Sequence, residues 1–181
     1  MILGLDPGTA FTGFGVITMV GNRLRALEFG VVETATDLPL AQRLEGIFTE
    51  IGELLRRHRP VATAVESLFF NANVRTALAV GHARGVTLLA CSQAGCEVFE
   101  YTPQQVKQAV VGYGKASKEQ VMEMVRVLLG LPRAPRPDHA ADALGVAICH
   151  ANISGVRESV ARSLERRDGT RAGGAERHSA K

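Results

Sequence analysis

The amino-acid sequence predicts an α/β domain in which a mixed five-stranded sheet is flanked by helices on both faces. Three strand-like segments follow one another near the N-terminus, and the later strands alternate with segments of helical apolar spacing. A meander followed by strand–helix–strand crossovers combines antiparallel and parallel pairing in one sheet. A length of 181 residues with 46% hydrophobic residues is typical of one globular domain and excludes a wholly disordered or fibrous chain.

The first half of the chain contains four of the strands and one helix. A short apolar strand ends at Asp6, and the fourth strand ends at Glu66. Gly21 and Asn22 form a turn suited to a hairpin. The helix stops before Pro60, because the residue before a proline avoids the helical conformation. The predicted elements are strands over residues 2–5, 14–19 and 24–32, a helix over 40–55, and a strand over 61–65.

The second half contains four helices and one further strand. Thr102 and Gln105 form a capping box, with Pro103 in the first turn of the helix that they open. Ser117 caps the helix that follows. The predicted elements are a helix over about 74–94, a strand over 98–101, a helix from 103, a helix over 118–129 and a last helix over about 138–152.

The excess positive charge lies in a C-terminal tail. The formal net charge is +3. Residues 156–181 hold seven basic and four acidic side chains, whereas residues 1–155 hold fourteen of each. Because the tail also has few apolar residues, we expect a folded domain over residues 1–155 and a basic, disordered tail over 156–181.

Cysteine usage and hydropathy predict a cytoplasmic protein. The three cysteines lack metal-finger spacing, and an odd number of thiols in a core-forming chain is typical of a reducing compartment. The N-terminal segment has no basic region and meets Asp6 after four residues, unlike a signal peptide. No apolar run approaches the roughly 20 residues of a membrane span, so we expect no membrane partner.

Acidic side chains mark the candidate site. Asp6 and Glu66 each follow an apolar strand, and both emerge at one sheet edge if the two strands are parallel neighbours. On the last helix, His139 and Asp142 are three residues apart and share a face. Singly, Asp6 fits a turn, Glu66 an exposed strand end and Asp138 a helix cap. Together such ligands repel one another unless divalent cations neutralise them, and two such cations suit phosphodiester hydrolysis.

Four segments of the sequence closely resemble the RuvC family, the bacterial Holliday-junction resolvases with an RNase H-like fold. They read ILGLDPGTAFTGFGVI, AVESLFFNANVRTALAVGHARGV, YTPQQVKQAVVGYGKASKEQV and PDHAADALGVAICH, and the resemblance covers residues 1–152 but not the tail. It implies two divalent metal ions per subunit, Mg²⁺ or Mn²⁺, held by the catalytic residues Asp6, Glu66, His139 and Asp142. Some members have aspartate in place of His139. The register of the following Ala-Ala-Asp-Ala-Leu favours His139, and the neighbouring Asp138 leaves a one-residue shift open.

A histidine in this ligand set has a chemical consequence. It replaces an anionic oxygen by a neutral nitrogen, which suits Mn²⁺ better than Mg²⁺. His139 serves either as a metal ligand or as the group that orients or deprotonates the attacking water. From the nitrogen ligand we expect Mn²⁺ to support cleavage at least as well as Mg²⁺. In either role, protonation of the imidazole should depress activity.

Aromatic and polar residues after Glu66 are candidate DNA contacts. Phe69 lies in a polar loop, where its ring either plugs the sheet edge or stacks on bases at a junction. By resemblance, Phe69 aligns with the wedge residue of the family. Asn73 and Arg75, in the same segment, are predicted to touch DNA phosphates.

A basic stretch follows later in the chain. Residues 103–136 hold six basic and two acidic side chains, whereas residues 1–53 hold three and seven. Next to a phosphodiesterase site, such a stretch is better read as a phosphate-binding surface than as a solvated face. The predicted contacts are Lys107, Lys115 and Lys118. By resemblance, Lys107 and Lys118 also match basic residues important to catalysis.

The helix over 74–94 predicts a homodimer. Small residues alternate there with leucine and valine, so the helix is apolar over more of its surface than one sheet covers. Two symmetric nicks are needed to resolve a four-way junction, and a twofold dimer supplies two sites. The resemblance adds a branch-migration motor complex, RuvA and RuvB, as a partner.

The sequence thus predicts a structure-selective endonuclease that resolves Holliday junctions by paired symmetric nicks, through two-metal-ion phosphodiester hydrolysis, in DNA recombination and repair. One alternative is a non-catalytic protein that binds four-way junctions, which would not need the acidic residues. Another is a related RNA-processing nuclease of the same fold, which Phe69 and the loop lysines disfavour.

Overall fold

The computed structural model describes residues 1–21, 23–67 and 74–155. It contains one compact unit, Met1–His150, and a second unit, Ala151–Lys181. The described residues of the second unit, 151–155, are helical, and the tail predicted over 156–181 lies outside the described residues. None of the helices in the described ranges is long and apolar enough to cross a membrane.

A mixed sheet forms the centre of the first unit. Its strands are β1 (Ile2–Asp6), β2 (Phe11–Val20), β3 (Arg23–Glu33), β4 (Ala62–Glu66) and β5 (Glu97–Tyr101). They are ordered β3-β2-β1-β4-β5 across the sheet. β1, β2 and β3 pair antiparallel as a meander, whereas β4 is parallel to both β1 and β5. This topology confirms the predicted mixed five-stranded sheet.

The hairpin strands extend beyond the predicted ranges. Strands were expected over residues 14–19 and 24–32, but pairing runs from Phe11 opposite Glu33 to Val20 opposite Arg23. These end residues are exposed, so apolar alternation does not mark them. Backbone pairing between β2 and β3 extends the strands to these exposed ends.

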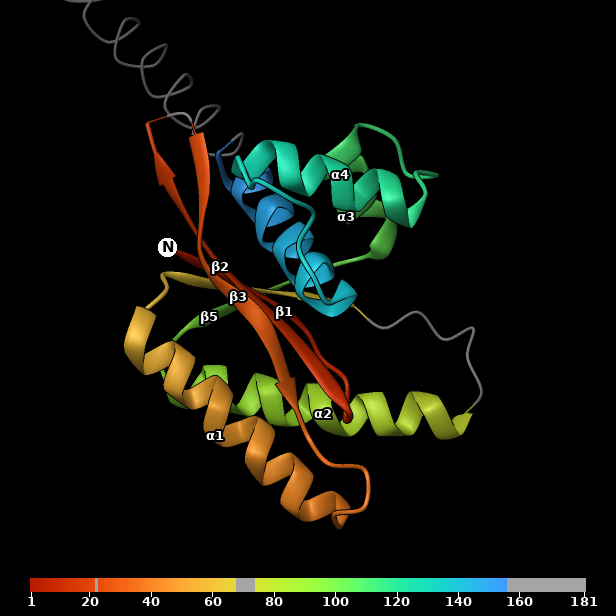
Figure 1. Cartoon of the computed structure of the whole chain (residues 1–181). Helices are drawn as coiled ribbons and strands as arrows, with labels where there is room; N and C mark the ends of the chain where they lie inside the picture. The colour runs from red at the N-terminus through yellow and green to blue at the C-terminus, as the bar shows by residue number, and fades with distance from the viewer. Residues whose placement is uncertain (22, 68–73, 156–181) are drawn as a thin grey trace, which may run out of the picture. The chain divides into compact units, whose positions relative to one another are not determined.

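Helices cover both faces of the sheet (Figure 1). They are α1 (Leu40–His58), α2 (Val74–Gln93), α3 (Pro103–Val111), α4 (Lys118–Leu129) and, ending the first unit, a last helix over 138–150. α1 and α2 lie on one face, and the last helix lies on the other with α3 and α4. The predicted caps are confirmed, because Thr102 and Ser117 both complete capping boxes.

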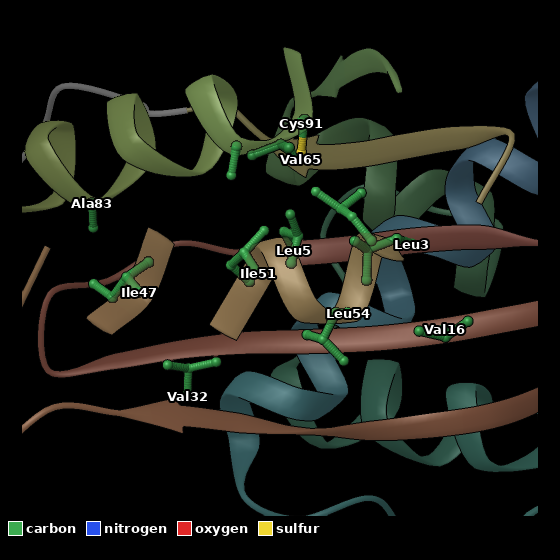
Figure 2. Close-up of a cluster of buried hydrophobic side chains, with 12 residues drawn as sticks. Leu3, Leu5, Val16, Val32, Ile47, Ile51, Leu54, Val65, Ala83 and Cys91 are labelled. Carbon is green, nitrogen blue, oxygen red and sulfur yellow. The ribbon is translucent and has the colours of Figure 1, made fainter. Parts of the chain in front are cut away.

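The main core lies between the sheet and the pair of α1 and α2 (Figure 2). Leu3 and Leu5 of β1 are fully buried there, and they point away from the face that Gly4 presents to the last helix. The buried members of this core are Leu3, Leu5, Val16, Val32, Ile47, Ile51, Leu54, Leu55, Val65, Ala83, Ala90 and Cys91. This packing fixes β1 and β4, whose ends carry two of the predicted acidic residues.

Candidate active site

Two of the predicted acidic residues lie at neighbouring strand ends. Asp6 is the last residue of β1, and Glu66 is the last residue of β4. The two strands are parallel, with Leu5 opposite Val65. Because parallel strands end at the same edge of a sheet, both carboxylates emerge there, as predicted.

Glycines in the sheet allow the last helix to approach this edge closely. A Cβ added at Gly4 would lie 2.0 Å from the carbonyl oxygen of Ala143, and one added at Gly13 would lie 2.0 Å from that of His139. Gly13 is directly opposite Asp6 in the β1–β2 ladder. Only glycine permits this contact between helix backbone and strand, and the contact brings His139 to Asp6.

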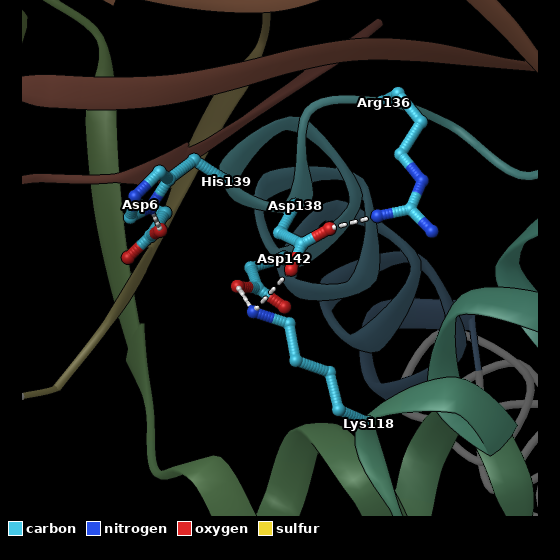
Figure 3. Close-up of polar contacts among 6 residues, drawn as sticks. All are labelled: Asp6, Lys118, Arg136, Asp138, His139 and Asp142. Atoms are coloured by element: carbon cyan, nitrogen blue, oxygen red, sulfur yellow. Dashed lines mark hydrogen bonds and ion pairs between the residues drawn. The ribbon is translucent and has the colours of Figure 1, made fainter.

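Three predicted ligands converge at this point (Figure 3). Nδ1 of His139 lies 2.7 Å from Oδ2 of Asp6. The imidazole also stacks on the ring of Phe11, with the centroids 5.8 Å apart. Asp142, one turn along the last helix, completes a group whose ligand atoms all lie within 4.8 Å of one another. Carboxylate oxygens with one imidazole nitrogen suit Mg²⁺ or Mn²⁺.

The charges of this group act on Glu66. Glu66 itself is not one of the three residues whose ligand atoms lie within 4.8 Å of one another. Burial raises the pKa of Glu66 to about 7, and the charges of Asp6 and Asp142 act in the same direction. Lys107 and Lys118 oppose that rise. Burial is the largest cause of this rise and the two aspartates add to it, so the carboxyl is both desolvated and close to like charges.

Lys118 forms a bridge at the rim of the site (Figure 3). Its Nζ lies 3.3 Å from Oδ2 of Asp142 and 3.3 Å from Oδ2 of Asp138. Partial burial lowers the pKa of Lys118, but the two carboxylates outweigh this and hold it above its ordinary value. Burial raises the pKa of Asp142, while Lys118 acts against the rise. Lys118 thus balances one of the crowded carboxylates.

Asp138 and His139 occupy different surroundings. The carboxylate of Asp138 pairs with Arg136 at 2.7 Å and with Lys118, whereas His139 lies against Asp6. The last helix begins at residue 138 itself. The geometry therefore brings His139, rather than Asp138, into the group with Asp6 and Asp142.

The structure describes only some of the predicted DNA contacts. Phe69 and Asn73 lie outside the described residues, and Arg75 is in α2 with its side chain undescribed. Lys107 is a half-buried residue of α3. Its positive charge acts against the rise in the pKa of Glu66, so it lies near the site. Lys115 is exposed in the segment before α4.

Three residues that help to position the candidate site were not identified from the sequence. Gly13 places the last helix, Phe11 stacks on His139, and Arg84 of α2 donates a hydrogen bond to the carbonyl oxygen of Glu66. A glycine within a strand and an arginine in the middle of an apolar helix are signals that could have pointed to two of them. We see no comparable sequence signal for Phe11.

The fold and the acidic sheet edge define the class of protein: a nuclease with an RNase H-like fold. Residues 2–150 match the family model of Crossover junction endodeoxyribonuclease RuvC. The chain belongs to this family, whose members are metal-dependent nucleases.

Curated relatives and solved structures agree with this assignment. The RuvC of Pelotomaculum thermopropionicum is 55% identical over 84% of this chain and 93% of its own. That of Rubrobacter xylanophilus is 58% identical over 83% and 84%. A structure of T. thermophilus RuvC in complex with a Holliday junction substrate has a TM-score of 0.81 and 44% identity, covering 84% of this chain and 93% of that chain. The predicted fold class and enzyme class are thus confirmed.

Proposed function

We propose that the chain resolves Holliday junctions by paired symmetric nicks that depend on two divalent metal ions at the β1–β4 edge. The convergence of Asp6, His139 and Asp142 within 4.8 Å carries this proposal. Glu66 completes the set, because it ends β4, the parallel neighbour of β1, and the charges of Asp6 and Asp142 add to the effect of burial on its pKa. The substrate class is supported by family membership and by the likeness to the T. thermophilus complex.

The donor set fits Mg²⁺ or Mn²⁺ through the oxygens of Asp6, Glu66 and Asp142 and a nitrogen of His139. When bound, two such ions activate a water and stabilise the leaving oxygen of the phosphodiester. Asp6 accepts a hydrogen bond from Nδ1–H of His139, which leaves the lone pair of Nε2 for a metal ion or for a proton of the attacking water. Phe11 stacks on the imidazole and limits its rotation.

Two lysines act on the phosphate in this proposal. Lys118 already balances Asp142, and Lys107 acts on the charge of Glu66, so both are close to the reacting group. They stabilise the negative charge that develops on the scissile phosphate. Lys115, exposed beside them, neutralises the DNA backbone further along.

Further DNA contacts belong to the same proposal. Phe69 acts as a wedge that stacks on bases at the junction, and Asn73 and Arg75 contact phosphates. Residues 1–155 form the nuclease domain, and the basic tail over 156–181 adds weak, salt-sensitive affinity.

We also propose a homodimer that works with RuvA and RuvB in the cytoplasm. Leu78 and Leu89 of α2 are 63% and 51% exposed, and a helix–helix contact between two copies would cover them. The two sites of the dimer then nick opposite strands of one junction.

A cleavage assay tests the proposed function. Purified protein is incubated with a synthetic four-way junction and a matched linear duplex, with Mg²⁺, with Mn²⁺ and with a chelator. We expect symmetric nicks in the junction only, and only when a divalent ion is present. Equal cutting of junction and duplex, or cutting in the chelator, would contradict the proposal.

A further inference from the structure

The guanidinium of Arg84 connects α2 to the ends of two strands. Its Nη1 donates to the backbone carbonyl oxygen of Glu66 at 2.7 Å, and its Nη2 lies 2.7 Å from Oε2 of Glu100. The side chain of Arg84 is only 12% exposed, whereas that of Glu100 is 53% exposed. A charge buried to this degree needs partners, and these two contacts join it to β4 and β5.

The backbone at Glu66 has little other support from the centre of the sheet. The ladder between β1 and β4 ends at Leu5 opposite Val65, one residue before Glu66. On the other side, Glu66 is opposite Tyr101 of β5, and the N–H of Ser67 donates to the Tyr101 carbonyl at 2.8 Å. Arg84 therefore adds a charge-assisted bond where the pairing with β1 has ended.

This position matters because the carboxylate of Glu66 faces negative neighbours. Asp6 and Asp142 both act on its charge, so repulsion works to displace the side chain when no cation is bound. A fixed carbonyl restrains the Cα of the same residue, and with it the carboxylate. Outer contacts of this kind commonly change metal affinity about 10–100-fold when they are removed.

We propose that Arg84 is a positioning residue that sets the divalent-metal affinity of the site by anchoring the backbone of Glu66. The inference rests on the proposed function, in which Glu66 is a metal ligand. Arg84 touches neither metal nor DNA in this role. Its planar fork joins the Glu66 carbonyl to the Glu100 carboxylate, a geometry that the single ammonium of lysine does not reproduce.

Arg84→Lys is therefore the informative variant, because it keeps the charge and removes the fork. Arg126 provides a matched control, since it also joins a carboxylate, that of Glu123, to a backbone carbonyl, that of Leu131. Arg126→Lys makes the same chemical change at the other end of α4 from Lys118. Glu100→Gln removes only the charge of the exposed partner, keeps an oxygen that can accept from Arg84, and is a milder second variant.

The experiment measures Mn²⁺ binding to DNA-free protein, the Mn²⁺ concentration for half-maximal junction cleavage, and the melting temperature in chelator. We expect Arg84→Lys to weaken Mn²⁺ binding and raise the half-maximal concentration, each about tenfold. Excess Mn²⁺ restores much of the cleavage. Glu100→Gln shifts both values less and in the same direction, and Arg126→Lys leaves them unchanged.

The outcomes separate this inference from the proposed function. Wild-type Mn²⁺ affinity in folded Arg84→Lys, or in Glu100→Gln if Arg84→Lys does not fold, overturns the role of Arg84. An equal loss in Arg126→Lys also overturns it, because the effect is then merely structural. Glu66→Gln with wild-type Mn²⁺ affinity and cleavage would instead contradict the proposed function.

Discussion

At the scale of single residues, the Glu66 carboxyl has the clearest electrostatic signature. Burial and the two neighbouring aspartates raise its pKa from 4.5 to about 7. An acid that binds its proton more tightly in the folded protein stabilises the fold at low pH. That stabilisation is complete below pH 4.5 and is lost as the pH rises through about 7.

Glu66→Gln should remove this part of the pH dependence. In chelator at pH 8, we expect the variant to have a higher free energy of unfolding than the wild type, by about 1–3 kcal/mol. Urea unfolding at pH 5 and pH 8 measures the free energy of unfolding of both proteins. If the free energies of unfolding of the two proteins changed with pH in the same way, the pKa of Glu66 would not be raised in the folded protein.

In the proposed site, His139 is expected to set the preference between Mn²⁺ and Mg²⁺. One imidazole nitrogen among carboxylate oxygens favours Mn²⁺ over Mg²⁺, so cleavage with Mn²⁺ should be at least as fast at matched concentrations. His139→Asp should shift the preference toward Mg²⁺. The rate ratio of the two ions in the two proteins is the measurement, and a clear Mg²⁺ advantage in the wild type would contradict this expectation.

The acidic residues of the candidate site were predictable from the sequence, because each of them interrupts an apolar pattern. Asp6 and Glu66 end apolar strands, and Asp142 lies within an apolar helix. Spacing alone did not decide whether Asp138 or His139 belongs to the candidate site with these residues. In the structure His139 lies in the group with Asp6 and Asp142, whereas Asp138 pairs with Arg136 and Lys118.

At the scale of elements, the contact between the last helix and the strands β1 and β2 determines the site geometry. Gly4 and Gly13 lie under Ala143 and His139, where side chains would collide with the helix backbone. The helix was predictable from its apolar run. Its depth against the sheet was not, because hydrophobic periodicity gives no weight to glycine.

Gly13→Ala should move the last helix away from Asp6. The added Cβ would lie 2.0 Å from the carbonyl oxygen of His139, so we expect about 1–3 kcal/mol loss of stability and a marked loss of cleavage. Gly52→Ala in α1 is the control, since nothing lies within 4 Å of its added Cβ. Chemical denaturation measures the stability of both variants, and a junction-cleavage assay measures their activity. A Gly13→Ala variant with wild-type stability and activity would refute the role of this contact.

At the scale of the whole molecule, opposite charges are separated along a chain whose residues 1–155 are neutral. Residues 1–53 contain Asp6 and an acidic excess, whereas residues 103–136 contain a basic excess with Lys107 and Lys118. This separation fits a cation site beside a phosphate-binding surface. The net charge of +3, taken alone, would have hidden this separation, because the tail carries the whole excess.

Removal of residues 156–181 should therefore leave junction selectivity intact. We expect a modest, salt-dependent loss of affinity for junction and duplex alike, because the tail contributes only unspecific charge. Binding of both DNAs at two salt concentrations tests this. Loss of selectivity with the tail would contradict the division between domain and tail.

The most direct test of the catalytic assignment compares two single-atom changes, Asp6→Asn and Asp138→Asn, in junction cleavage with Mn²⁺. Asp6 contacts His139 within the site, whereas Asp138 pairs with Arg136 and Lys118 at the rim. We expect Asp6→Asn to bind the junction normally and to lose cleavage on the order of a hundredfold, with Asp138→Asn within several-fold of wild type. Wild-type cleavage by Asp6→Asn, or an equal loss in both variants, would contradict the account.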